Sequence, residues 1–202
     1  AEINLQWKHK EDDFNDFSNQ YLIPHELSTK GPKIAVGDVN KDGLDDMYLC
    51  GAKNQPGALF IQTKDGKFIQ STNACFKNDS AYEDVYALFF DADKDGDKDL
   101  YVCSGGNELA GKNPLLLDRL YINDGKGNFT KSVNKIPSIY QNKSVVCTAD
   151  IDHDGDTDLF IGVSANALQY GIPQTSYILL NDGKARLNDA VGQGNFSLMN
   201  DA

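Results

Sequence analysis

Apolar and polar residues alternate along most of the chain in short runs. Alternation with a period of two predicts half-buried β-strands, because successive side chains of a strand point to opposite faces of a sheet. Helical periodicity is weak throughout, and only Glu11 to Tyr21 is predicted to form a short helix. The pattern therefore predicts an all-β fold.

The predicted strands recur in three similar units. Their first halves are KIAVGDVNKDGLDDMYLCGA from Lys33, YALFFDADKDGDKDLYVCSGG from Tyr86 and VVCTADIDHDGDTDLFIGVSA from Val145. Each unit continues with a variable loop, an apolar run, an Asp-Gly pair (Asp65-Gly66, Asp124-Gly125 or Asp182-Gly183) and a second run. Asp-Gly between alternating runs is a strong hairpin signal, because glycine readily adopts positive φ. Each unit therefore predicts four antiparallel strands, the pattern of a propeller blade.

The repeats divide the chain into a lead-in and three blades. The lead-in is 1–32, blade 1 is 33–84 with an acidic loop at 38–46, blade 2 is 85–143 with a loop at 91–99, and blade 3 is 144–202 with a loop at 150–158. Three blades are fewer than the about four to eight of typical propellers. We expect a partial propeller, which is either a fragment of a longer chain or one completed by oligomerisation, because open repeats leave edge strands that invite pairing.

The acidic loops have the chemistry of calcium sites. In DADKDGDKDL, residues 91–100, aspartates alternate with other residues and a glycine stands at the sixth loop position. Calcium takes about six to eight oxygens in a flexible shell, and alternating carboxylates turned inward would supply them. The residue at position seven would contribute its backbone carbonyl. The predicted ligands are Asp38, Asn40, Asp42, Leu44 and Asp46 in the first loop, Asp91, Asp93, Asp95, Asp97 and Asp99 in the second, and Asp150, Asp152, Asp154, Asp156 and Asp158 in the third.

Three further expectations follow for these loops. An EF-hand is excluded, because it requires a bidentate Glu at position twelve, where this chain has Leu49, Val102 and Ile161. The first site should bind calcium more weakly, because Asn40 replaces one carboxylate. The side chains of Asp97 and Lys98 are expected to face solvent.

Composition agrees with bound cations. The net charge is −11, and the acids are 25 Asp against 5 Glu. Three divalent cations would add six charges and reduce −11 to −5, so the acidity is interpreted as a metal signature, while a nucleic-acid partner would require a basic patch. The chain has no long uncharged apolar run that would insert into a membrane and no signal peptide at its start. Cys50, Cys75, Cys103 and Cys147 show no CxxC spacing and are interpreted as small buried thiols, although the sequence leaves a disulfide open.

The segments Gly37–Asp46, Asp91–Leu100 and Asp150–Leu159 resemble FG-GAP or VCBS-type repeats, which are related to the calcium-binding blades of integrin α-subunits. The lead-in, with Trp7, Phe14 and Phe17 expected to anchor it by packing, is similar to that of secreted bacterial proteins related to the ASPIC/UnbV group. The resemblance implies up to three structural Ca²⁺ ions per chain, in loops between the first two strands of each blade. It also implies extracellular or cell-surface placement and a role in adhesion or ligand binding.

A ligand is expected on the side opposite the calcium loops. In a blade the first and third connections share one side, so the variable loops 52–57, 104–117 and 164–175 share the other, and loops on a rigid scaffold often bind ligands. The candidate contacts to a protein or glycan ligand are Asn107, Glu108, Lys112, Asn113 and Tyr170. No catalytic constellation is visible, so an enzyme is not expected. The alternative is a part of a calcium-dependent polysaccharide lyase, since fold alone does not fix function.

Overall fold

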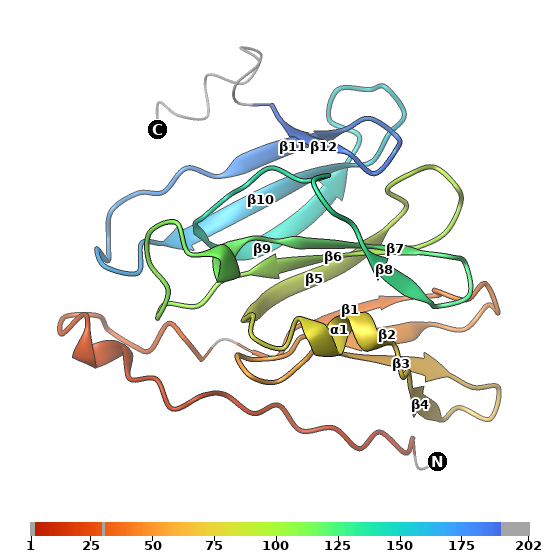
Figure 1. The fold of residues 1–202 in the computed structure, drawn as a ribbon, viewed down its shortest axis with the longest axis horizontal. Helices are drawn as coiled ribbons and strands as arrows, with labels where there is room; N and C mark the ends of the chain where they lie inside the picture. Colours follow the sequence, from red (N-terminus) through yellow and green to blue (C-terminus); the bar gives the residue numbers. More distant parts are fainter. Residues whose placement is uncertain (1–2, 30, 191–202) are drawn as a thin grey trace.

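In the computed structural model, which describes residues 3–29 and 31–190, the chain forms three four-stranded antiparallel sheets. Figure 1 shows the sheets stacked in chain order, with the lead-in along the outer side of the first. The all-β prediction is confirmed, and the three blades of the described residues do not close into a ring. Blade 1 contains β1 (Ile34–Gly37), β2 (Asp46–Leu49), β3 (Ala58–Gln62) and β4 (Phe68–Gln70); blade 2 contains β5 (Asp84–Phe90), β6 (Asp99–Ser104), β7 (Arg119–Asn123) and β8 (Phe129–Lys131); blade 3 contains β9 (Asn142–Ala149), β10 (Asp158–Ala165), β11 (Tyr177–Asn181) and β12 (Leu187–Asp189).

Helical structure is limited to single turns in the described residues. The helix expected over Glu11 to Tyr21 shrinks to a 3-10 turn at Asp16–Ser18, begun by Asn15, whose side chain accepts a hydrogen bond from Phe17 N. A second 3-10 turn lies at Pro114–Leu116, and α1 (Ala74–Asn78), which the sequence pattern did not predict, follows blade 1. None of these helices has the length and apolar content to cross a membrane.

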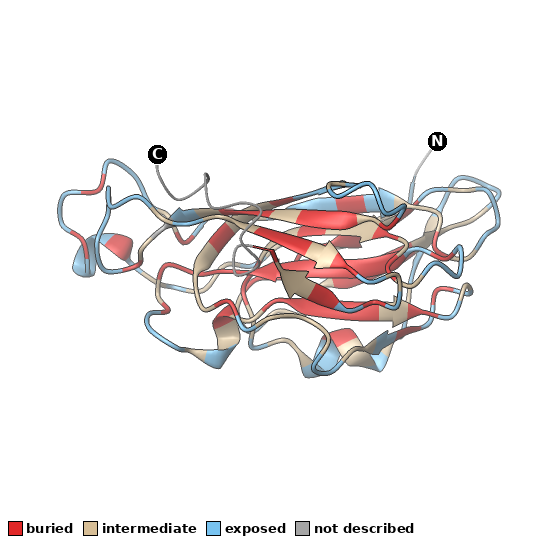
Figure 2. Ribbon diagram, turned by 90° about the horizontal axis from the view of Figure 1, so that it is seen from above, coloured by how far each residue is buried: buried red, intermediate tan, exposed pale blue. Residues whose placement is uncertain are grey.

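Most of the core lies in two apolar layers between neighbouring blades, and a third, smaller cluster lies between blade 1 and the lead-in. Alternation along β6 determines which layer each side chain enters: Leu100 faces blade 1, whereas Tyr101 faces blade 3. Figure 2 shows buried residues running along the central strands of all three sheets. Burial of apolar surface contributes about 25 cal/mol per Å², so these two layers are the main source of stability. Members of the layer between blades 1 and 2 include Tyr48, Leu59, Val102 and Tyr121, and members of the layer between blades 2 and 3 include Leu120, Leu159, Ile161 and Leu179.

The cysteines are free thiols in the structure. Cys50 and Cys103 are fully buried in the two interblade layers, as predicted. Cys75 is half-buried and Cys147 is exposed on blade 3, so burial holds for the first two only.

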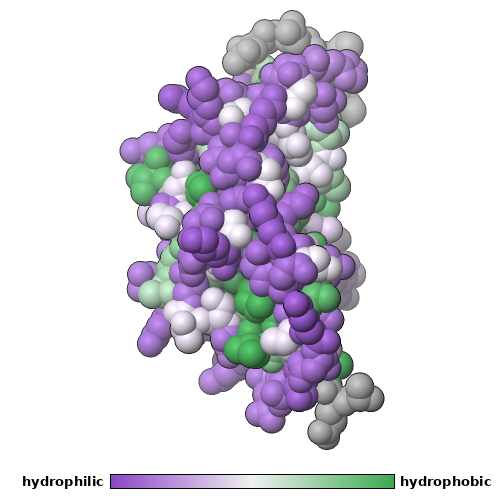
Figure 3. All heavy atoms as spheres, turned by 90° about the vertical axis from the view of Figure 1, so that its right-hand side faces the viewer, coloured by the Kyte–Doolittle hydropathy of each residue, from purple (hydrophilic) through white to green (hydrophobic). Residues whose placement is uncertain are grey.

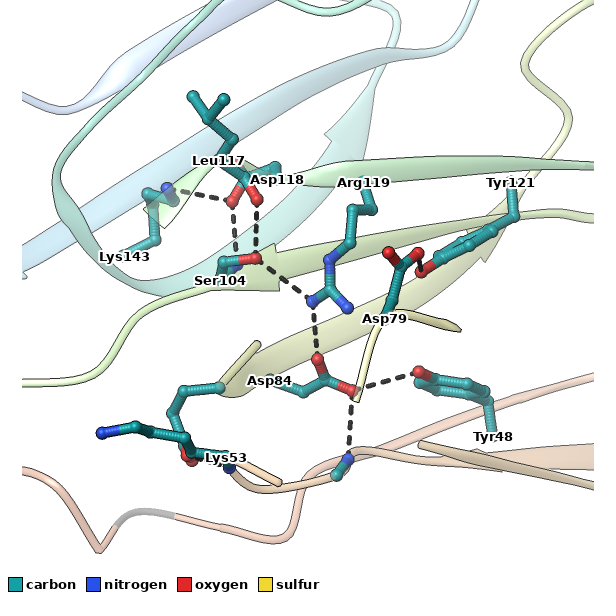
Figure 4. A network of polar contacts seen from close by, with 12 residues as sticks. Tyr48, Lys53, Asp79, Asp84, Ser104, Leu117, Asp118, Arg119, Tyr121 and Lys143 are labelled. Atoms are coloured by element: carbon teal, nitrogen blue, oxygen red, sulfur yellow. Dashed lines mark hydrogen bonds and ion pairs between the residues drawn. The ribbon is translucent and has the colours of Figure 1, made fainter. Parts of the chain in front are cut away.

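A buried carboxylate joins blade 1 to blade 2 (Figure 4). Asp84, at the start of β5, accepts hydrogen bonds at Oδ2 from Tyr48 Oη (3.0 Å) and Gly51 N (3.0 Å). Its Oδ1 atom pairs with Arg119 NH2 at 2.5 Å, and both side chains are almost fully buried. The guanidinium also lies 4.2 Å from the centroid of the Tyr82 ring. Because a buried charge must be paired, this cluster fixes the contact between the two blades.

At the junction of blades 2 and 3, a buried carboxylate again bonds a tyrosine hydroxyl, a backbone N–H and a cationic side chain. This carboxylate comes from a different position of the repeat. Asp118 accepts hydrogen bonds from Tyr101 Oη and Ser104 N, each at 2.8 Å, and pairs with Lys143 Nζ of β9 at 3.0 Å (Figure 4). The Lys143 side chain has no exposed surface and also donates to Ile139 O at 3.0 Å. In this junction the acid belongs to the preceding blade and the base to the following one.

The two junctions differ at two equivalent repeat positions. Asp84 and Lys143 both lie seven residues before the first aspartate of their acidic loops, and Gly57 and Asp118 both directly precede the third strand. Where blade 2 has Asp118, blade 1 has Gly57, and the carboxylate of Asp84 enters that space. A Cβ atom on Gly57 would lie 2.0 Å from Tyr48 Oη and 3.0 Å from Asp84 Oδ2. Glycine is therefore required here for space.

Substitution of Gly57 by alanine should destabilise the protein by about 1–3 kcal/mol, the usual cost of overpacking a core, because the methyl group displaces Tyr48 and the Asp84 carboxylate. Gly37→Ala is the control, since its Cβ would meet Phe89 at an ordinary 3.5 Å. Urea denaturation of both variants checks this. Equal midpoints for the two would contradict the packing argument.

Candidate functional site

The three acidic loops lie together at one end of the molecule, on the right in Figure 1, and each joins the first two strands of its blade, as predicted. Seen from this end, the surface is mostly hydrophilic (Figure 3). In every loop the first aspartate accepts a hydrogen bond from the glycine N–H at position six; in blade 2 this bond joins Asp91 Oδ2 and Gly96 N at 3.0 Å. The glycine φ angles are +84°, +81° and +85°, a left-handed bend that glycine adopts without strain.

The aspartate at position nine of each loop fastens the loop to its own blade. Asp99 is fully buried, and its two oxygens accept hydrogen bonds from Ala92 N (2.9 Å) and Asn123 N (2.8 Å). Burial raises the pKa of Asp99 to about 7, although these two N–H groups oppose the rise. Asp46 and Asp158 make the corresponding pairs of bonds. These residues, predicted only as metal ligands, thus also bridge the acidic loop and the start of the Asp-Gly turn.

Two loops gather carboxylates closely enough for a cation. Oxygen atoms of Asp91, Asp93 and Asp99 all lie within 4.8 Å of one another, and the corresponding three aspartates of blade 3, at 150, 152 and 158, do the same. Asp91 Oδ1 and Asp93 Oδ1 are buried without a hydrogen-bond partner among the described residues. A hard cation that binds oxygen would satisfy these atoms and offset the repulsion of like charges. The residues therefore fit calcium.

The first loop gathers fewer carboxylates. Asn40 occupies its third position, and its amide Nδ2 donates to Asp42 Oδ2 at 3.2 Å. The weaker calcium affinity expected of this loop stays a prediction.

The expectation that Asp97 faces solvent is wrong. Its side chain is only 9% exposed and pairs with Lys41, from position four of the preceding loop. Lys94 makes the same contact with Asp156 of blade 3. Both lysines adopt φ of +61°, and their side chains reach the neighbouring loop. This contact between blades is not revealed by the residue spacing within one loop. Lys98 is exposed, as predicted.

Two asparagines that bridge neighbouring blades were not predicted to do so from the sequence, which indicated only that they belong to turns. Asn123 Nδ2 donates to Val39 O of blade 1 at 2.7 Å, and Asn181 Nδ2 donates to Ala92 O of blade 2 at 2.9 Å. Each therefore joins its blade to the preceding acidic loop. The signal was present in the repeated Asn-Asp-Gly of blades 2 and 3, where blade 1 has Lys64-Asp65-Gly66.

The five candidate ligand contacts lie in different surroundings at the opposite end. Asn107 is 2% exposed and donates to Asp16 of the lead-in. The Glu108 side chain is 5% exposed and lies 3.5 Å from Lys53 Nζ, while Asn113 caps a 3-10 turn through Leu115 N. Lys112 and Tyr170 are exposed. Two of the five side chains are thus open to solvent.

A pocket of about 560 Å³ lies between the variable loops of blades 2 and 3. Its lining combines aliphatic and aromatic surface with amides and a lysine, and it contains Lys112 but none of the other four predicted contacts. Gln141 Oε1 is buried there without a hydrogen-bond partner in the described part of the chain. Representative lining residues are Leu109, Lys112, Tyr140, Gln141, Asn166 and Tyr177.

A carboxylate cluster surrounds Lys53 beside the blade 1 loop. Lys53 Nζ lies 3.2 Å from Asp12 Oδ2, and Lys53 N donates to Glu83 Oε2 at 2.6 Å. Burial raises the pKa of Glu83 to about 8; the Lys53 N–H lowers it, and the carboxylates of Glu11, Glu108 and Asp84 raise it further.

These features define a class of protein: an all-β repeat protein made of propeller-type blades with an acidic, cation-compatible loop in each. A sequence model of the FG-GAP-like repeat matches residues 38–102 and 91–161, more than half of the chain, and the protein belongs to this family. No curated protein sequence matches it.

Among solved structures, the fold is similar to that of a lectin from Agrocybe aegerita. That lectin specifically recognises non-reducing terminal N-acetylglucosamine. The TM-score is 0.50 at 17% identity, and the match covers 77% of this chain and 36% of the lectin chain. This chain therefore spans about a third of that relative. At this identity the similarity shows the fold alone.

Replacing Asp93 by asparagine should remove most of the stabilisation that calcium gives through the second loop. A site that binds only the folded state contributes about 2.7 kcal/mol when calcium is a hundredfold above its dissociation constant. In EGTA the variant should be as stable as the parent or more so, because one like charge is lost. Asp45→Asn, an exposed residue at position eight of the first loop, is the control. Thermal unfolding in calcium and in EGTA measures both; identical calcium shifts in Asp93→Asn and the parent would exclude Asp93 as a ligand.

The buried Glu83 should make the protein less stable as the pH rises. Its pKa is about 8 when folded, against about 4.3 in an unfolded chain, so the folded state holds the extra proton between these values. Stability linked to this group is complete below about pH 4 and falls until about pH 8. Glu83→Gln should reduce the difference in melting temperature between pH 5 and pH 9, and the exposed Glu26→Gln should not. A difference unchanged in Glu83→Gln would contradict the shift.

Proposed function

We propose that the protein is an extracellular or cell-surface binding module, stabilised by calcium, that recognises a glycan through the pocket between blades 2 and 3. The pocket carries the proposal, because it is an open pocket of about 560 Å³ with a mixed polar and apolar lining at the loop end of a rigid scaffold. The distant similarity to a lectin that recognises N-acetylglucosamine supports a glycan over other ligands.

The chemistry of the lining suits a pyranose ring. A sugar presents an apolar face of C–H groups and a rim of hydroxyls, so it needs flat apolar surface together with hydrogen-bonding groups. Tyr140 and Tyr177 supply rings, Asn166 and Lys112 supply polar groups, and Gln141 Oε1 is a buried acceptor that a hydroxyl would satisfy. Leaving such an acceptor unsatisfied costs about 1–3 kcal/mol, so a donor from a ligand gains affinity.

Calcium has a structural role in this proposal. The acidic loops lie at the end of each sheet opposite the variable loops, so a cation there would not touch the ligand. It would neutralise the carboxylates of connections that otherwise repel, and mass action would stabilise the folded blades.

Binding without catalysis is the function that the pocket supports best. Among its described lining residues Asp189 is the one carboxylate, whereas hydrolysis of a glycosidic bond generally uses a pair. A lyase would instead need a general base, and because Lys112, Tyr140 and Tyr177 line the pocket, cleavage is tested directly. Incubation of the protein with polysaccharides distinguishes the two functions. Shortened polysaccharide chains would support the lyase, and binding without shortening would support the non-catalytic binding module.

The test is isothermal titration calorimetry, in which the folded, calcium-loaded protein is titrated with N-acetylglucosamine or with its β-linked dimer. Lys112→Ala should weaken binding by about tenfold, the usual range for a hydrogen bond to a charged group. Lys77→Ala, an exposed lysine in the last turn of α1, serves as the control. If neither sugar nor any member of a glycan array binds, the glycan proposal is wrong.

A further inference from the structure

The lead-in crosses the loop ends of all three blades. It begins along the outer side of blade 1, where Leu5 and Trp7 pack against Leu49 and Phe60, so the expected packing anchor is confirmed for Trp7. Phe17, expected to share that role, is 39% exposed. Figure 1 shows the segment continuing along the outside of blade 1 to the end opposite the acidic loops, where it turns back toward β1.

The first contact is with the variable loop of blade 1. Lys10 N donates to Gln55 Oε1 at 2.7 Å, and Gln55 Nε2 donates to Lys8 O at 2.8 Å. Asp12 then pairs with Lys53 at 3.2 Å. One side chain of the loop, that of Gln55, is thus held through both its donor and its acceptor.

The second contact is with the long loop of blade 2. Asp16 is fully buried, and its Oδ2 atom accepts hydrogen bonds from Leu27 N (3.1 Å), Ser28 N (3.0 Å) and Ser28 Oγ (2.6 Å), which closes the turn of the lead-in. Its Oδ1 atom accepts from Asn107 Nδ2, and this buried bond anchors the loop 104–117.

The third contact is with the loop of blade 3. Gln20 is 8% exposed, and its Nε2 atom donates to Ala167 O and, at 3.5 Å, to Asn166 O. Asn166 and Ala167 also line the pocket, and Leu109 of the blade 2 loop lines its other side. The lead-in therefore holds both walls of the pocket through Asp16 and Gln20, which do not themselves line it.

We propose that the lead-in is a latch across the loop ends, and that Asp16 and Gln20 are positioning residues that hold the two pocket walls in a fixed arrangement. Long loops are costly to order, and a site whose loops are already fixed binds more tightly because less conformational entropy is lost on binding. The latch itself stands on the contacts above, whereas its effect on affinity rests on the proposed glycan function.

Two substitutions break the latch without touching the pocket lining. Gln20→Ala removes the bonds to blade 3, and Asn107→Ala removes the bond to Asp16 while leaving the turn of the lead-in intact. The control is Asn19→Ala, an exposed neighbour that bonds Asp16 O through its backbone N–H, which alanine retains. Backbone amide exchange by mass spectrometry should show about fivefold faster exchange in 164–175 for Gln20→Ala and in 104–117 for Asn107→Ala, as expected for one lost hydrogen bond.

Affinity for N-acetylglucosamine gives the second measurement. Both variants should bind it severalfold more weakly than Asn19→Ala, although neither loses a lining side chain. Unchanged exchange in both loops would overturn the latch. Faster exchange with unchanged affinity would overturn the positioning role. If the parent protein binds no sugar, the proposed function fails, and the exchange rates alone decide whether the latch exists.

Discussion

The carboxylate at the ninth position of each acidic loop is the interaction on which the rest of the structure depends. Asp46, Asp99 and Asp158 have no exposed surface, and each accepts one backbone N–H from its loop and one from the strand that enters the next turn. A buried carboxylate is tolerated only when its hydrogen bonds are satisfied. These bonds shape the loop so that the earlier aspartates converge, and Asp99 and Asp158 also complete the two carboxylate triads that fit a cation.

The blades are held to one another differently at their two ends. At the acidic-loop end, exposed lysines and buried turn asparagines make contacts with the neighbouring blade. Toward the loop end, Asp84 of blade 2 accepts hydrogen bonds from Tyr48 and Gly51 of blade 1 and pairs with Arg119 of its own blade. Asp118 of blade 2 pairs with Lys143 of blade 3. Because the equivalent repeat positions carry Asp84 in blade 2 and Lys143 in blade 3, exchanging these two blades would bury Lys143 opposite Gly57, without a carboxylate to pair with it. The buried pairs thus specify blade order as well as contact.

The sequence predicted what depends on near neighbours. The strands, the acidic loops and the Asp-Gly turns follow from alternation and spacing within a few residues, and these predictions are confirmed. Contacts between distant segments were not accessible in this way. Asp97 was expected in solvent and Asn107 was named as a ligand contact, yet both are buried by partners, Lys41 and Asp16, that lie 56 and 91 residues earlier in the chain. Their burial is decided by how blades and lead-in pack, which leaves no local pattern.

Successive acidic loops are joined by the ion pairs Lys41–Asp97 and Lys94–Asp156, and the first and last loops differ at the positions that would continue this pattern. Blade 1 carries Leu44 where the later loops have Asp97 and Asp156, and blade 3 carries His153 where the earlier loops have lysine. A second molecule placed head to tail would set His153 against Leu44 and meet an outer face of blade 1 already covered by Leu5 and Trp7. Repeats add to one another head to tail when their two ends are complementary. At these two ends the lysine–aspartate contact that joins successive blades within the chain would be missing.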